Sequence, residues 1–124
     1  MSAAIRPDSV PALALEKAFL NYDVCVSLET LGELTMMLGR SKFDRYAPAR
    51  QRDDFVAGFR ARAVVVEVIT IVTDCVDPND NVFLALAETA EADLIVSSDP
   101  HLTSLHPWRG IPIFPPAAFL VWIR

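Results

Sequence analysis

The chain has 124 residues, a length that suits one domain with a single core. Hydrophobic residues make up 52 % of it, too many for a disordered protein, yet no apolar run is long enough to span a membrane. The net charge of −5 argues against a passive nucleic-acid binder but leaves room for an enzyme whose acids hold cations. Without a signal-peptide pattern, and with Cys25 and Cys75 placed apart in apolar runs, we expect a cytoplasmic protein with free thiols.

The N-terminal third predicts a helix, a strand and a second helix. Asp8 and Ser9 can cap a helix that begins near Pro11 and continues to Tyr22. Residues 23–26 are apolar after the first position and predict a buried strand. Ser27 is a good N-cap for the next helix, which we expect to end at Gly39. Glu33 lies on the flank of that helix's apolar face, where a solvated side chain is its simplest interpretation.

The middle of the chain predicts a long helix followed by a strand. The helix covers residues 48–63 and forms the most basic region, with Arg50, Arg52, Arg60 and Arg62. These arginines suit either a solvated face with local salt bridges or a surface that contacts phosphates. Residues 64–72 are rich in β-branched side chains and predict a strand that is interrupted near Glu67.

The stretch 77–99 predicts a helix, a tight loop and a strand. Asp77 can cap the helix, Pro78 fits its first position, and Asp80 falls three residues after the cap. Residues 94–96 form a short apolar strand, and Asp99 comes just after it. A short turn at 101–105, an edge strand at 111–114 and a last helix from Pro115 complete the chain.

Strands alternate with helices, so the sequence predicts an α/β fold with a parallel sheet. In such a sheet the carboxyl ends of the strands share one edge with the starts of the following helices, and ligands bind there. Glu33, Asp80 and Asp99 fall at such positions, with Asp77 as a fourth acid. For Asp80 and Asp99 taken singly, helix capping is the simpler explanation.

The acids, if they converge, offer only oxygen ligands. Oxygen ligands suit Mg²⁺ or Mn²⁺ better than zinc. His101 and His106 lack supporting ligands nearby, so we expect surface or packing roles for both.

Four segments of the chain, in this order and spacing, resemble the PIN domain, and more narrowly the bacterial toxin-like PIN proteins of the VapC type. They are residues 27–34, 40–43, 77–87 and 97–99. The resemblance implies a three-layer α/β/α fold with a central, mostly parallel sheet, over a single domain at 1–124. It also places Glu33, Asp80 and Asp99 on the family's second, third and fourth acids. Asn81 and His101 stand where the family often has further aspartates.

The sequence departs from the family at its N-terminus. The family opens with a central strand that ends in an Asp-containing turn, and that first strand is missing here, so the domain is N-terminally truncated relative to the family. Residues 1–4 match what normally follows the turn. We expect the natural reading frame to start upstream. The alternatives are a sheet that closes over the gap, another chain that fills it, or a degenerate, inactive relative.

The resemblance implies a metal-dependent endoribonuclease, the toxin component of a toxin–antitoxin system, with Glu33, Asp80, Asp99 and Asp77 holding Mg²⁺ or Mn²⁺. The four arginines would hold the RNA. We expect weak or no activity in this form, because one carboxylate ligand is missing. The expected partners are an antitoxin and further copies of the chain. We expect no association with a membrane. The competing hypothesis is a non-catalytic PIN-like module that binds a protein partner such as an antitoxin.

Overall fold

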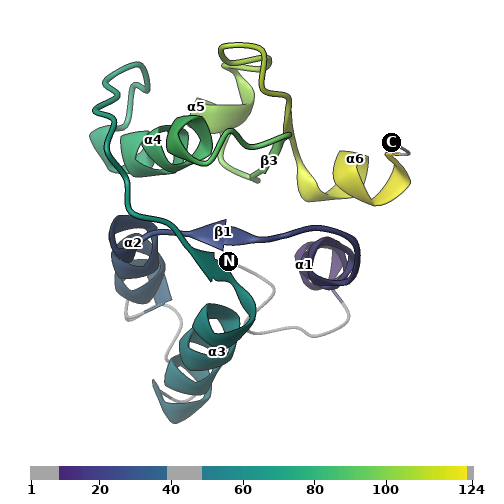
Figure 1. The fold of residues 1–124 in the computed structure, drawn as a ribbon. Coiled ribbons are helices and arrows are strands. Elements are labelled where there is room, and N and C mark those ends of the chain that lie inside the picture. The colour runs from purple at the N-terminus through teal and green to yellow at the C-terminus, as the bar shows by residue number, and fades with distance from the viewer. Residues whose placement is uncertain (1–8, 39–48, 123–124) are drawn as a thin grey trace. The chain divides into compact units, whose positions relative to one another are not determined.

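The structure is a computed structural model that describes residues 9–38 and 49–122. The chain divides into two compact units, Met1–Val65 and Val66–Arg124. Each contains helices and one pair of parallel strands, as the ribbon in Figure 1 shows, so the predicted α/β class is confirmed. The predicted helix end at Gly39, the segment 40–43 and residues 1–8 lie outside the described part of the chain.

The first unit contains the two predicted N-terminal helices, the long basic helix and two short strands. Its elements are α1 (Val10–Asn21), β1 (Cys25–Val26), α2 (Leu28–Leu38), α3 (Ala49–Arg62) and β2 (Val64–Val65). Strand β1 runs parallel to β2, with Cys25 opposite Val64. Leu34 of α2 packs against Phe55 and Val56 of α3, so these two helices share a small core.

Both predicted N-caps of this unit are confirmed. The hydroxyl of Ser9 accepts a hydrogen bond from the backbone N–H of Ala12 at the start of α1 (3.3 Å). At α2 the bonds are reciprocal: the Thr30 N–H donates to Ser27 Oγ (3.1 Å), and the Ser27 N–H donates to Thr30 Oγ1 (2.9 Å). These bonds satisfy N–H groups that a helix start leaves without a partner.

The second unit begins with an extended segment and then carries the remaining elements. They are the 3₁₀ turn η2 (Pro78–Asp80), α4 (Asn81–Thr89), β3 (Ile95–Val96), α5 (Pro100–Thr103), β4 (Ile113–Phe114) and α6 (Pro116–Val121). Strand β3 runs parallel to β4, with Ile95 opposite Ile113.

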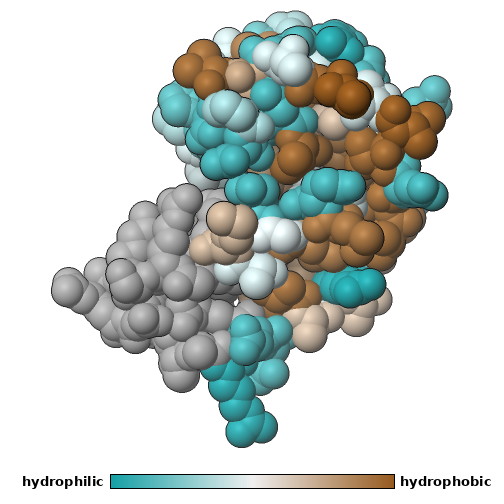
Figure 2. Space-filling view, turned by 90° about the vertical axis from the view of Figure 1, so that its left-hand side faces the viewer, coloured by the Kyte–Doolittle hydropathy of each residue, from teal (hydrophilic) through white to brown (hydrophobic). Residues whose placement is uncertain are grey.

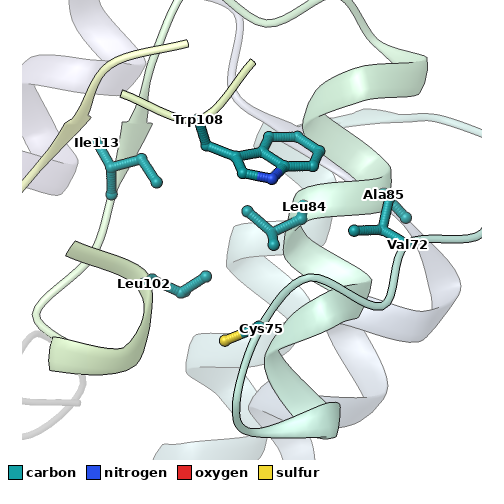
Figure 3. Close-up of a cluster of buried hydrophobic side chains, with 7 residues drawn as sticks. All are labelled: Val72, Cys75, Leu84, Ala85, Leu102, Trp108 and Ile113. Atoms are coloured by element: carbon teal, nitrogen blue, oxygen red, sulfur yellow. The ribbon is translucent and has the colours of Figure 1, made fainter. Parts of the chain in front are cut away.

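The core of the second unit lies between α4, α5 and β4. Figure 3 shows Leu84 of α4, Leu102 of α5 and Trp108 converging on one apolar centre, with Cys75 at its border. Leu84 is fully buried, and Leu102 is 3 % exposed. Their burial holds α4 and α5 together, and these two helices carry the acidic residues at their N-terminal ends.

A polar network ties the loop after α5 to the segment that precedes η2. The indole N–H of Trp108 donates to Asp74 Oδ2 (2.8 Å). Arg109 donates to the same oxygen (3.2 Å) and to Glu88 Oε1 on α4 (2.7 Å). The network fixes the backbone just before Cys75, where the chain turns toward η2.

The prediction of a strand over residues 64–72 is largely wrong. Only Val64–Val65 pair with a neighbour, and within the described residues the segment 66–74 joins no ladder. β-Branched side chains favour an extended backbone, but a strand also needs a partner for its N–H and C=O groups. Ile69 and Ile71 are 84 % and 92 % exposed.

Exposed apolar side chains also occur elsewhere on the surface. Figure 2 shows hydrophobic side chains (brown) interspersed with hydrophilic ones on one face of the molecule. Among the residues that the structure describes, no helix has the length and apolar character to cross a membrane.

Candidate metal centre

Three side chains of the second unit come together at one point. Asp77, Asp80 and His101 each offer one ligand atom, and these atoms lie within 4.8 Å of one another. Asp77 caps η2, Asp80 ends η2, and His101 is in the first turn of α5. The group joins two of the predicted acids, Asp77 and Asp80, to a histidine. The predicted convergence of Glu33, Asp80 and Asp99 stays a prediction.

Local hydrogen bonds fix the turn that carries the two aspartates. Asp77 Oδ1 accepts from the Asn79 N–H (3.0 Å), and the Asp77 carbonyl accepts from the Asp80 N–H (3.0 Å). The side-chain oxygen of Asn81 accepts from the Cys75 N–H (2.8 Å). Asn81 thus anchors the incoming chain to the start of α4, a structural role for the position where the family often has an aspartate.

Asp99 lies beside this group and caps α5, as expected for a residue just after a strand. Its Oδ1 accepts from the backbone N–H of His101 (2.9 Å), and its own N–H donates to Ser97 Oγ (3.0 Å). The same Oδ1 is 3.8 Å from Nδ1 of His101. Asp99 therefore positions the residue that brings the imidazole to the cluster.

Asp80 is the buried member of the group. It is only 8 % exposed, and its Oδ2 has no hydrogen-bond partner among the described residues. Its carboxylate also makes no capping bond at the start of α4, so capping does not explain it. A buried carboxylate oxygen without a donor is costly, because burial removes the water that would otherwise solvate it.

Burial raises the pKa of Asp80 to about 7, and a hydrogen bond with Asp99 and the negative charges of Asp99 and Asp77 add to the increase. For Asp99, burial alone would raise the pKa, but the hydrogen bond with Asp80 and the bond from the His101 N–H outweigh it, so its pKa is lowered. The interaction between the two carboxyl groups therefore moves their pKa values apart, upward for Asp80 and downward for Asp99.

The remaining predicted site residues lie in the first unit. Glu33 is half-buried on α2, and Arg50, Arg52, Arg60 and Arg62 are on α3. Arg62 is 3.7 Å from Glu16 and stacks over the ring of Phe19, so it already has local partners. The roles predicted for Glu33 and for the arginines stay predictions.

The two histidines have different surroundings. His106 Nδ1 accepts from the Ile113 N–H (2.9 Å), and its ring packs against Phe114, as the packing role requires. His101 instead lies with the aspartates, so the surface or packing role expected for it does not account for its position. The signal for a site role was its place where the PIN family often has an aspartate, two residues after Asp99.

The donor set fits a divalent cation. Two carboxylates and an imidazole are common ligands of such ions, and the Asp80 carboxylate has an oxygen for which the described residues provide no hydrogen-bond partner. The surrounding core holds α4 and α5 in place, so the ligands are presented by a packed scaffold.

The comparisons with known proteins identify the family. A model of the PIN domain family matches residues 1–101, most of the chain. No curated protein and no solved structure matches the chain. Since the match covers well over half of the sequence, the chain belongs to the PIN domain family.

Proposed function

We propose that this protein is a metal-dependent endoribonuclease that acts as the toxin component of a toxin–antitoxin system in the cytoplasm. The observation that carries the proposal is the buried Asp80 carboxylate, which belongs to the Asp77, Asp80 and His101 group and has one oxygen without a hydrogen-bond partner among the described residues. The membership of the PIN domain family supports it, because the resemblance implies ribonuclease activity.

In this proposal Asp77, Asp80 and His101 hold the ion, Mg²⁺ or Mn²⁺. The bound ion supplies Lewis acidity, which activates water and offsets the negative charge that develops at the phosphorus of an RNA phosphodiester. Asp99 holds the backbone of His101 in place and adds negative charge beside Asp80. Glu33 is proposed as a further acid of the same centre.

The arginines of α3 are proposed to hold the RNA backbone. Arg50 and Arg60 are exposed, and Arg62, although paired with Glu16, is half-exposed at its side chain. Arginine suits this task, since its planar guanidinium binds phosphate oxygens through two N–H groups at once. Binding of this kind weakens as salt concentration increases.

RNA cleavage tests the proposal directly. The purified chain is incubated with a mixed RNA substrate and Mn²⁺, with and without EDTA. We expect at most weak cleavage, which EDTA abolishes and which Asp80→Asn and Asp99→Asn each abolish. Glu91→Gln is the matched control, because it removes one charge from an exposed side chain of the same unit. Cleavage that persists unchanged in the Asp80 and Asp99 variants would come from a contaminant and would refute the proposal.

The toxin role has its own test. Expression of the chain in a bacterial host is expected to arrest growth, and Asp80→Asn is expected to restore it at equal protein level. Growth arrest that Asp80→Asn leaves unchanged would favour the non-catalytic module that binds a protein partner.

Self-association is part of the proposal, since α1 and α2 expose apolar side chains such as Leu13, Leu20 and Met36.

A further inference from the structure

The imidazole of His101 gives this cluster a nitrogen donor that a site built only from carboxylates lacks. We propose that His101 makes the site selective for first-row transition-metal ions, Mn²⁺ among them, over Mg²⁺. The inference rests on the proposed metal site but not on RNA cleavage, because it concerns only which ion the cluster binds.

The first part of the argument is that the cluster has an anchor for a cation. Asp80 is 8 % exposed, and its Oδ2 has no hydrogen-bond partner among the described residues. Asp77, Asp80 and His101 each offer one ligand atom, and these atoms lie within 4.8 Å of one another. A cation bound by the Asp80 carboxylate would offset the cost of burying its charge.

The second part is that the ring of His101 is available as a ligand. Among the described residues its ring nitrogens make no hydrogen bond; Nδ1 lies 3.8 Å from Asp99 Oδ1, and the side chain is 52 % exposed. Its backbone N–H is held by Asp99 Oδ1 at 2.9 Å, so the residue is fixed while its ring remains accessible. By contrast, the ring of His106 is engaged by the Ile113 N–H.

The third part is the chemistry of the ions. Mg²⁺ prefers oxygen ligands in strict octahedral geometry and keeps much of its water. Imidazole suits iron, nickel, copper and zinc, and the affinity of first-row ions for a given site rises from manganese, the weakest binder of the series, to copper. Replacing one oxygen donor by an imidazole therefore weakens the site for Mg²⁺ more than for Mn²⁺.

Calorimetric titration of the full chain, first freed of metal, gives the affinities of Mn²⁺ and Mg²⁺. We expect Mn²⁺ to bind more tightly, and His101→Asp to reduce the ratio of the two affinities by roughly tenfold or more. His106→Asn is the matched control. It removes the other imidazole but keeps an acceptor for the Ile113 N–H, and we expect it to leave the ratio unchanged.

A second measurement needs no substitution. In the wild-type chain labelled with ¹⁵N, Zn²⁺ is expected to shift the resonance of one ring nitrogen of His101, whereas Mg²⁺ leaves it in place. An unchanged affinity ratio in His101→Asp, a ring that Zn²⁺ leaves unshifted, or no binding of Mn²⁺ at all would overturn the inference. If both measurements give the expected result but RNA is not cleaved, the nuclease proposal fails and the selectivity of the site stands.

Discussion

Asp80→Asn is expected to stabilise the metal-free protein, and to do so more strongly at alkaline than at acid pH. Burial and the neighbouring acids raise the pKa of Asp80 to about 7 in the folded chain, against an ordinary value of 3.8. Because the folded chain binds this proton more tightly than the unfolded chain, the proton stabilises the fold fully at a pH below the pKa of the unfolded chain. This stabilisation is lost as the pH rises through about 7. Asparagine carries no charge to lose and can donate to Asp99 through its amide group.

The magnitude follows from the pKa. Each pH unit over which the folded chain holds one more proton than the unfolded chain changes the free energy of unfolding by about 1.4 kcal/mol. Between pH 5.5 and pH 8.5 the wild-type protein therefore loses about 2 kcal/mol that the variant keeps. The lowered pKa of Asp99 does not offset this difference, because its contribution is lost only as the pH falls through acid values.

The assay is urea unfolding in EDTA at pH 5.5 and pH 8.5, followed by tryptophan fluorescence. Both tryptophans, Trp108 and Trp122, lie in the second unit, so the signal reports the unit that carries the cluster. Glu91→Gln, which removes an exposed charge from the same unit, should show the same difference from the wild type at both pH values. Equal stabilisation by Asp80→Asn at both pH values, or destabilisation at pH 8.5, would refute the reasoning.

Three further outcomes are expected. Mn²⁺ at a hundred times its dissociation constant should stabilise the wild-type second unit by about 2.7 kcal/mol in the same fluorescence assay, and Asp80→Asn should remove this effect. Leu84→Ala leaves a cavity at a fully buried position and should lower the free energy of unfolding by about 3 kcal/mol. Val121→Ala, at a position 78 % exposed, should lower it by less than about 0.5 kcal/mol. Equal urea midpoints for the two variants would contradict the packing described. Ser27→Ala removes the cap of α2 and should cost about 1 kcal/mol by circular dichroism, and an unchanged transition would mean that the cap contributes nothing.

Features that depend on neighbours in the sequence were predictable. Ser9 and Ser27 cap helices because a short polar side chain before an apolar, helix-forming segment satisfies the first N–H groups wherever the helix packs. Asp99 caps α5 for the same reason. The family was recognisable because several such local segments occur in a characteristic order, and the family match confirms it.

Features that depend on distant parts of the chain were not predictable in the same way. The extent of the strand after Val64 depends on a hydrogen-bonding partner, which side-chain propensity does not reveal. His101 lies close to Asp77 only because η2 and α5 are brought together by the core around Leu84 and Leu102. The raised pKa of Asp80 likewise arises from its burial and from the proximity of Asp99 in the folded chain.

The extended segment that follows β2 has a consequence for handling the protein. From residue 64 to residue 72 the only charged side chain is Glu67, and the exposed Ile69 and Ile71 lie two and four residues after it. Short, β-branched stretches with little charge are templates for cross-β aggregation when their backbone groups are free to pair with another chain. Glu67 therefore acts as a gatekeeper, whose negative charge opposes stacking of identical segments in concentrated solution.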